Sequence, residues 1–324
     1  MKNVRVTVLR GGPSEEYDVS MRTGQEVIKA LSECNYDVND IVISRSGAWI
    51  VHGFERQPIE ALSATDVVFI ALHGSYGEDG TVQRLLDSLA IPYTGSKAYA
   101  STVAMNKIFT KEKLKNCGIK MAPHMRVTSG NNDLSRIALT IDSLFGSDFI
   151  VKPVDGGSSI DTHLVSGTTE LIQALRKSFL NRDEVLVEKM IKGREATVGV
   201  VERFRNQSVY RLPVIEIIPP DSTKFFDAEV KYNGQTEEIC PGRFTREQKE
   251  ELENLAEKVH DELGLAQYSR SDFIVAKDGI YFLEVNTLPG LTTESLLPKA
   301  LGTVWCSYAD FLKHLLSDAL RKRK

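Results

Sequence analysis

A short stretch of the chain, residues 268–286, holds side chains that could bind a metal ion beside a phosphate. Two β-rich runs flank Lys277-Asp278-Gly279, a pattern typical of a three-residue hairpin loop with glycine in the left-handed position. In the register that this loop sets, four polar side chains project from one face of the hairpin, because side chains alternate along a strand. The four are Arg270, Asp272, Glu284 and Asn286.

The predicted register places Asp272 directly opposite Glu284. Two facing carboxylates repel each other, and a hard divalent cation between them removes that cost. With Asn286 as a third oxygen donor and no Cys or His, the set suits Mg²⁺ rather than Zn²⁺. The alternative is a hairpin face whose charges are simply solvated. The following turn, Pro289-Gly290, favours the functional reading, because it brings backbone N–H groups that could stabilise an oxyanion.

A second polar segment, residues 151–159, could contact phosphate. A strand delivers Lys152, and the loop Gly156-Gly157-Ser158-Ser159 follows it. Glycine lets the backbone approach a ligand, and free N–H and hydroxyl groups suit phosphate oxygens. Taken alone this is weak, because Gly-Gly-Ser is often a surface loop. The chain lacks both the P-loop and the G-x-G-x-x-G motifs.

A third candidate is Glu188, which closes the apolar strand that begins at Val185. It could be a charge at a strand end or an acceptor for a ribose hydroxyl at the carboxyl end of that strand.

The elements around these segments predict an α/β protein. In the first third, the strand patterns 4–9, 40–44 and 67–72 alternate with helices, which indicates parallel βαβ units. Glycine-rich turns follow the first and third of these strands, at the edge where such sheets bind ligands. From residue 185 the strands follow one another with short turns, which indicates an antiparallel sheet.

Composition excludes several classes of protein. Of the 324 residues, 42% are hydrophobic and 26% charged, with a net charge of −4, so neither a disordered chain nor a general polyanion binder is expected. The four cysteines form no C-x-x-C pair and are read as reduced thiols. No apolar run is long enough for a membrane span or a secretory signal, so we expect a cytoplasmic protein that binds neither membranes nor nucleic acid.

In their order along the chain, the motifs resemble the ATP-grasp superfamily and, within it, the D-alanine–D-alanine ligase family. The segments that carry the resemblance are Gly11–Glu16, Phe69–Gly74 with Gly77–Thr81, Pro92–Ser96, Met105–Lys107, Val151–Pro153 with Gly157–Ser159, Glu229–Tyr232, Cys240-Pro241 and Leu283–Thr287 with Pro289-Gly290. Each is modest alone, and the resemblance rests on their joint order over nearly the whole chain.

The resemblance implies an ATP-grasp fold of three parts. They are a Rossmann-like parallel-sheet domain at 1–96 with the first D-alanine site, a small central α+β lid at 97–184, and a C-terminal antiparallel-sheet α+β domain at 185–324 with the Mg²⁺ and oxyanion site. The implied reaction uses ATP to phosphorylate one D-alanine, whose acyl phosphate is attacked by the amine of a second D-alanine, for peptidoglycan precursor synthesis. Similar enzymes are often dimers, so a homodimer is an open expectation.

The resemblance also implies a nucleotide site. Lys107 and Lys152 hold ATP phosphates, and Lys231 reaches the transferring phosphate. The backbone of Lys189, Met190 and Ile191 takes adenine, Glu188 takes the ribose, and Glu195 belongs to the same pocket. Asp272, Glu284 and Asn286 hold two Mg²⁺ ions, for which Mn²⁺ could substitute.

For the amino acids, the resemblance implies that Glu16 binds the ammonium of the first D-alanine, with His73 close by and Ser158 and Tyr232 around it. Arg270 and the Gly290 N–H stabilise the oxyanion, and Ser295 binds the second carboxylate. The chain departs from the family pattern at Tyr17-Asp18, Val154-Asp155, Asp161 and Glu294. The alternatives are a related ligase that uses D-serine or D-lactate, and a nucleotide-binding module without activity.

Overall fold

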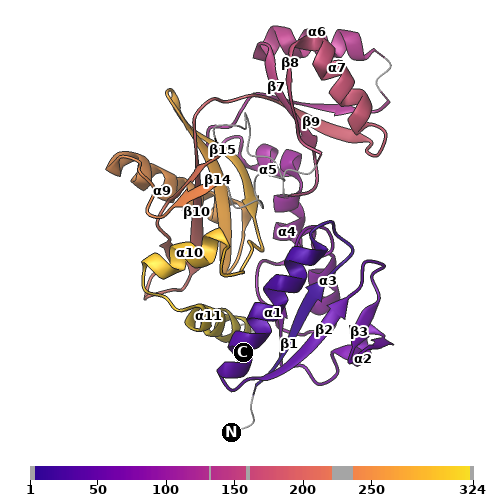
Figure 1. Cartoon of the computed structure of the whole chain (residues 1–324), viewed down its shortest axis with the longest axis vertical. Coiled ribbons are helices and arrows are strands. Elements are labelled where there is room, and N and C mark those ends of the chain that lie inside the picture. The colour runs from indigo at the N-terminus through magenta and orange to yellow at the C-terminus, as the bar shows by residue number, and fades with distance from the viewer. Residues whose placement is uncertain (1–3, 131–132, 158–160, 221–235, 322–324) are drawn as a thin grey trace.

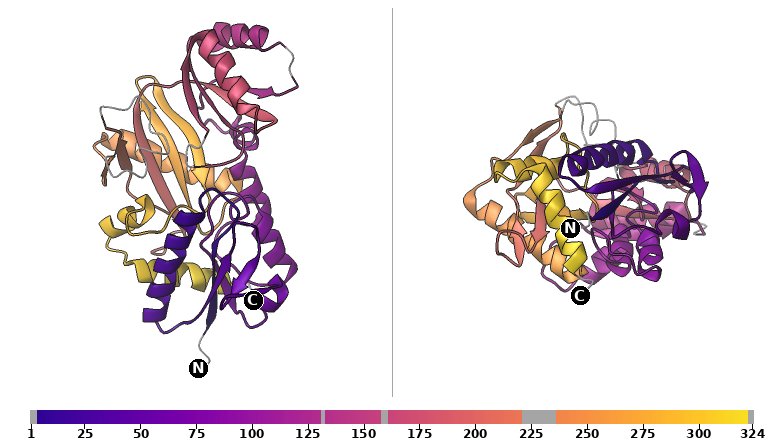
Figure 2. Two further views of the ribbon diagram at one scale, coloured as in Figure 1. Left: turned by 45° about the vertical axis from the view of Figure 1, so that its right-hand side comes forward. Right: turned by 90° about the horizontal axis from the view of Figure 1, so that it is seen from below.

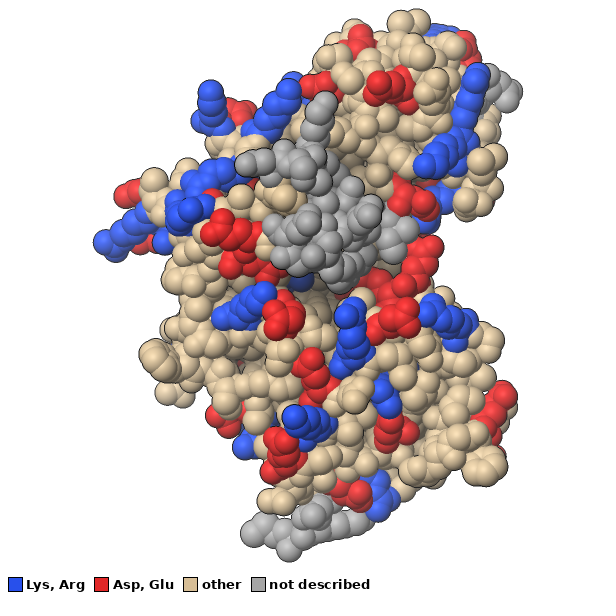
Figure 3. All heavy atoms as spheres, viewed as in Figure 1, with Lys and Arg blue, Asp and Glu red and all other residues tan. Residues whose placement is uncertain are grey.

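A computed structural model describes residues 4–130, 133–157, 161–220 and 236–321 of the chain. Three sheets organise these residues, with the first at one end of the molecule and the four-stranded sheet at the other (Figure 1). Acidic and basic side chains are interspersed over the face that Figure 3 shows, in keeping with the small net charge. Over the described residues, every helix is too short or too polar to cross a lipid bilayer.

The first sheet has the strand order β4-β3-β2-β1-β5. Strands β1 (Arg5–Gly11), β2 (Asp37–Ile43) and β5 (Val67–Ile70) pair in parallel, as predicted, while β3 (Trp49–Val51) and β4 (Phe54–Arg56) extend it as an antiparallel edge. The helices that connect or follow these strands in the chain are α1 (Tyr17–Glu33), α2 (Pro58–Ala61) and α3 (Thr81–Ser88).

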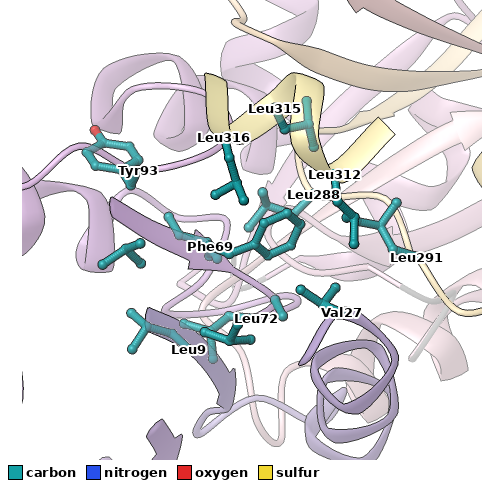
Figure 4. Packing of buried hydrophobic residues seen from close by; sticks show 14 of the residues in the cluster. Leu9, Val27, Phe69, Leu72, Tyr93, Leu288, Leu291, Leu312, Leu315 and Leu316 are labelled. Atoms are coloured by element: carbon teal, nitrogen blue, oxygen red, sulfur yellow. The ribbon is translucent and has the colours of Figure 1, made fainter. Parts of the chain in front are cut away.

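The last helix of the chain, α11 (Tyr308–Arg321), completes the core of this first sheet. Its residues Leu312, Leu315 and Leu316 are fully buried in one cluster with Leu9 and Phe69 (Figure 4). Views from two further directions show α11 beside α1 and the first strands (Figure 2). The two ends of the sequence are therefore held together by apolar burial.

The central sheet has four antiparallel strands in the order β6-β9-β7-β8. The strands are β6 (His124–Thr128), β7 (Asp148–Pro153), β8 (His163–Ser166) and β9 (Glu184–Lys189), and the helices α6 (Leu134–Phe145) and α7 (Gly167–Ser178) pack on them. The sequence pattern groups the run 185–189 with the C-terminal strands. In the structure β9 instead pairs with β6 and β7, because its apolar side chains fill the central core.

The largest sheet has six strands in the order β13-β12-β10-β14-β15, with β11 paired to β10. They are β10 (Arg194–Glu202), β11 (Val209–Arg211), β12 (Ile215–Ile218), β13 (Glu237–Ile239), β14 (Tyr268–Ala276) and β15 (Gly279–Asn286), all antiparallel as predicted. Helix α9 (Arg246–Leu263) covers one face, and a capping box at Thr245 and Gln248 begins it. Helix α10 (Leu296–Thr303) follows the sheet.

Helices α4 (Ala98–Met105) and α5 (Lys107–Leu114) share a core with α9 and β15. The domain limits expected from the sequence assign these helices to the central part. We propose instead to count α4 and α5 with the C-terminal sheet and β9 with the central sheet, since that is where their apolar side chains are buried.

The hairpin of β14 and β15 has a shorter loop than the sequence pattern predicts. Ala276 pairs with Gly279 rather than with Ile280, so Lys277 and Asp278 alone form the loop. A β-bulge then leaves Leu283 as an extra residue between the pairs formed by its neighbours. The bulge restores the predicted pairs of Asp272 with Glu284 and of Arg270 with Asn286.

The bulge decides which way Glu284 points. In an unbroken ladder Glu284 would share the face of Phe282 and Ile280, which lie in the core with α9. The extra residue reverses the alternation, so Glu284 lines a cavity on the opposite face.

Candidate active site

A cavity of about 520 Å³ lies between the central and the six-stranded sheets. Its lining includes apolar residues from both sheets, among them Ile150, Ile217 and Ile274. It also includes nine of the residues predicted from the sequence to bind nucleotide or metal. These are Lys107, Lys152, Glu188, Lys189, Met190, Ile191, Glu195, Asp272 and Glu284.

The carboxylate of Asp272 is held from three directions. Arg270, two residues away on the same strand, donates from Nε and Nη2 to the two carboxylate oxygens at 3.0 Å each. Asn286 Nδ2 donates to Oδ2 at 3.2 Å, and Thr197 Oγ1 on β10 donates to Oδ1 at 2.5 Å. Burial alone would lower the pKa of Arg270, but the charge of Asp272 raises it above its ordinary value. The four predicted hairpin residues therefore do converge, and Thr197 joins them.

Lys107 connects this hairpin to the glycine loop. Its Nζ donates to the Gly156 carbonyl oxygen at 2.7 Å and lies 3.3 Å from Glu284 Oε2. The side chain of Asn106 caps the start of α5 by accepting from Ile108 N and Phe109 N. Lys107 is thus fixed at the first turn of a helix with its ammonium directed at the cavity.

On the opposite wall, Glu188 lies between two lysines. Lys152 Nζ and Lys111 Nζ are each 2.6 Å from one of its oxygens, and the Glu188 side chain is only 3% exposed. Burial alone would raise the pKa of Glu188, but Lys111 and Lys152 together lower it to about 2. Both oxygens therefore face lysines, and the expected contact of Glu188 with a ribose stays a prediction.

The segment predicted to meet adenine leaves the end of β9. The N–H of Lys189 donates to the Pro123 carbonyl at 2.9 Å, and that of Met190 to the Asp148 carbonyl at 3.0 Å. These bonds fix the path of residues 189–191 along the cavity. Gly193 follows, where a Cβ would lie 2.5 Å from the Val275 carbonyl oxygen, so only glycine lets the chain pass β14.

Glu16 lies at a smaller pair of cavities, of about 30 and 250 Å³, next to the main one. A Cβ on Gly74 would lie 2.7 Å from Glu16 Oε2, and one on Gly157 3.5 Å from it. Lys107, Gly156, Gly157 and Glu284 line both the main cavity and the 30 Å³ one. The residue predicted for the first ammonium therefore adjoins the residues predicted for phosphate and metal.

Glu78 is not among the site residues predicted from the sequence, although it stands in one of the motifs that carry the family resemblance. Its Oε1 accepts from Gly74 N at 3.0 Å, and its Oε2 from Thr287 N at 3.1 Å and Leu288 N at 3.0 Å. Burial, with the charge of Glu16 next, raises its pKa. Glu78 thereby ties the N-terminal loop to the segment that follows Asn286.

His73 makes a second tie to the same segment. Its Nδ1 donates to the Leu288 carbonyl at 2.9 Å, so its Nε2 can accept from Thr23 Oγ1, also at 2.9 Å. The expected place of His73, near Glu16, agrees with the bond from Ser14 Oγ to the His73 carbonyl oxygen.

Gly290 and Ser295 also lie side by side. A Cβ on Gly290 would be 2.8 Å from Ser295 Oγ, and that oxygen accepts from Thr292 N at 3.1 Å. Three further predicted residues, Ser158, Lys231 and Tyr232, fall outside the described residues.

Comparison with known proteins gives two family matches that together span most of the chain. The family described as D-ala D-ala ligase N-terminus matches residues 5–61 and 52–96, and D-ala D-ala ligase C-terminus matches residues 114–317. The chain belongs to the D-alanine–D-alanine ligase family. The family and the ATP-grasp fold predicted from the motifs are confirmed, and so is the enzyme class of an ATP-dependent ligase.

Relatives in this family align over nearly their full length. A D-alanine–D-alanine ligase of Geobacter sulfurreducens is 39% identical over 330 residues, which cover 100% of this chain and 96% of the relative. One from Fervidobacterium nodosum is 35% identical, with 97% of this chain and 98% of the relative covered.

Solved structures are also similar to this chain over nearly their full length. A D-alanine–D-alanine ligase of Bacillus anthracis complexed with ATP is 32% identical with a TM-score of 0.81, covering 99% of this chain and 98% of its own. The VanG D-Ala:D-Ser ligase of Enterococcus faecalis is 26% identical with a TM-score of 0.84, covering 98% of this chain and 100% of its own.

Proposed function

We propose that this chain joins two D-alanines into D-alanyl-D-alanine at the expense of ATP, a step in peptidoglycan precursor synthesis. The γ-phosphoryl group passes to the carboxylate of the first D-alanine, which gives an acyl phosphate and ADP. The amine of the second D-alanine then attacks the acyl carbon, and phosphate leaves. The single observation that carries the proposal is the hairpin cluster of Arg270, Asp272, Glu284 and Asn286, whose two carboxylates line a cavity together with Lys107 and Lys152.

The main cavity is the proposed ATP site. Lys107 and Lys152 would bind phosphate oxygens, and apolar residues such as Ile150 and Ile274 would contact adenine along the 189–191 segment. Glu195, at the start of β10, lines the same cavity, which supports its proposed place in the nucleotide pocket. Phosphoryl transfer depends mostly on positioning and charge neutralisation, which this set of lysines supplies.

Asp272, Glu284 and Asn286 are the proposed Mg²⁺ ligands. They fit the ion because they are hard oxygen donors and because two carboxylates face each other across the hairpin. Among the described residues, no group of three or more His, Cys, Asp or Glu side chains is arranged to hold a metal ion, and here the amide oxygen of Asn286 would be the third donor beside the two carboxylates. Bound Mg²⁺, or Mn²⁺ in its place, would neutralise charge on the polyphosphate.

The amino acids would lie on the N-terminal side of the cavity. Glu16 would bind the first ammonium. Arg270 and the Gly290 N–H would hold the oxyanion, and Ser295 the second carboxylate. Lys231 would reach the transferring phosphate, with Ser158 and Tyr232 near Glu16.

Phosphate release from ATP tests the proposal. We expect release with D-alanine alone and none without an amino acid, and D-alanyl-D-alanine should form in equal amount. Release that requires D-serine or D-lactate beside D-alanine would assign a different second substrate. ATP binding without turnover under every condition would reject the ligase. Light scattering of the same sample would test the expected homodimer.

A further inference from the structure

The buried cluster of Glu188, Lys152 and Lys111 contains a lysine that the proposed reaction does not use. Lys152 and Glu188 both line the main cavity, whereas Lys111 lies behind Glu188 and is only 2% exposed. Lys111 stands one helical turn after Lys107 on α5, so the two ammonium groups emerge from one face of the helix. Neither the motifs nor the proposed roles account for burying this second charge.

The cost of isolating a buried charge points to a role for Lys111. Removing the counter-ion of a buried carboxylate strongly destabilises the folded protein. Glu188 has one cation on each oxygen, at 2.6 Å in both cases. If Lys152 leaves one oxygen for a phosphate, Lys111 still neutralises the other.

We propose that Lys111 is a positioning residue for nucleotide binding, which keeps Glu188 paired so that Lys152 can turn from Glu188 to the phosphates. The inference rests on the proposed function, because it takes the main cavity as the ATP site. Without Lys111, Lys152 alone would neutralise Glu188. Every contact that Lys152 made with phosphate would then leave Glu188 as a buried carboxylate without a counter-ion.

Binding calorimetry with ATP and with adenosine tests this role in the full chain. Replacing Lys111 with Met should weaken ATP binding at least about tenfold, while adenosine, which has no phosphate, should bind within about twofold of wild type. Lys111→Arg should largely restore ATP binding because it keeps the charge. Lys113→Met, at an exposed position of the same helix, is the matched control and should bind ATP normally.

A double-substitution cycle decides between positioning and mere packing. In a Glu188→Gln background no buried carboxylate needs a counter-ion, so adding Lys111→Met should change ATP affinity by less than about threefold. If the Met substitution weakens ATP binding equally in both backgrounds, or weakens adenosine binding as much, the inference is wrong. If Lys111→Met alone does not fold, the ATP affinities of Glu188→Gln and of the double variant still distinguish the two roles, because a loss beyond about threefold in the double variant contradicts positioning.

Failure of this inference differs from failure of the proposed function. A wild-type chain that binds no ATP would remove the proposed function itself. A wild-type chain that binds ATP, with an equally tight Lys111→Met variant, would remove only the role of Lys111.

Discussion

The main cavity has two walls: the central wall, which carries Glu188 and Lys152, and the hairpin wall, which carries Asp272 and Glu284. The two walls differ in how the charge of their carboxylates is neutralised. On the central wall, Glu188 is 3% exposed and each of its oxygens has a lysine at 2.6 Å. On the hairpin wall, the Glu284 side chain is 25% exposed, and Lys107 Nζ is 3.3 Å from its Oε2. The central wall is a tight cluster with a surplus of positive charge. On the hairpin wall, Arg270 pairs with the buried Asp272 and Lys107 lies beside the more exposed Glu284, so positive and negative charges balance.

The difference separates the two kinds of ligand that we propose. A wall with surplus lysines attracts phosphate, whereas facing carboxylates attract a divalent cation. The two walls come from different sheets, so a magnesium–nucleotide complex placed between them would meet complementary charge on both sides.

The largest effect should come from removing a carboxylate on the hairpin wall. Asp272→Asn, or Glu284→Gln, should lower kcat/KM roughly 10²–10³-fold, because it removes one strong electrostatic contact with the transition state. Phosphate release at saturating ATP and Mg²⁺ measures the loss, and thermal unfolding controls for folding. If either variant kept more than about a tenth of the activity, the hairpin wall would not be the metal site.

The central wall should show its charge in the pH dependence of stability. The pKa of Glu188 is lowered to about 2 in the folded chain, so its stabilising contribution is complete above the ordinary carboxyl pKa of 4.5 and is lost as pH falls towards 2. Denaturant unfolding of wild type and Glu188→Gln should therefore differ by roughly 3 kcal/mol less at pH 2 than at pH 7. A difference that stays constant over this range would mean that the lysines do not hold the carboxylate.

Thr197 tests how firmly the hairpin wall is positioned. Thr197→Val removes the donor at 2.5 Å from Asp272 Oδ1, a buried hydrogen bond to a charged group worth about 1.5–3 kcal/mol. We expect lower stability in urea and roughly tenfold lower kcat, because Asp272 loses one of its supports. Thr197→Ser keeps the hydroxyl and should behave like wild type. Equal behaviour of the two variants would assign Thr197 to packing alone.

The smallest effect should lie at Gly74, which lines the two smaller cavities next to the main one. Gly74 has a φ of +67°, and a Cβ there would lie 2.7 Å from Glu16 Oε2. Gly74→Ala should cost about 1 kcal/mol of stability and raise the KM for the first D-alanine several-fold. Gly47→Ala, with a φ of +87° and nothing within 4 Å, is the matched control. It should lose similar stability with an unchanged KM, and a changed KM in this control would contradict the steric explanation.

Much of the hairpin wall follows from the sequence, but not the way in which it forms. The sequence predicts the facing of Asp272 and Glu284 with a loop one residue too long, and the pairing holds because the bulge at Leu283 compensates. Local propensity does not reveal a bulge, since its position depends on which side chains the core and the cavity accept.

The supporting residues are harder to find from the sequence. Thr197, Lys111 and Glu78 lie in an ordinary strand, helix and loop, respectively. Each matters because of a partner that is distant in the sequence: Asp272 is 75 residues from Thr197, Glu188 is 77 from Lys111, and Thr287 is 209 from Glu78. Only Glu78 lies within a motif that carries the family resemblance, so a sequence signal exists for it alone.

The sequence by itself determined the family, the alternation of strands and helices, and the chemical types of the candidate site residues, because those depend on local pattern and on the order of motifs. The tertiary structure decided that β9 belongs to the central sheet, that α11 closes the first core, and that Glu188 pairs with two lysines. The physical reason is that burial and charge pairing are properties of space. A buried carboxylate takes its counter-ions from whichever elements pack around it, however far apart they lie in the chain.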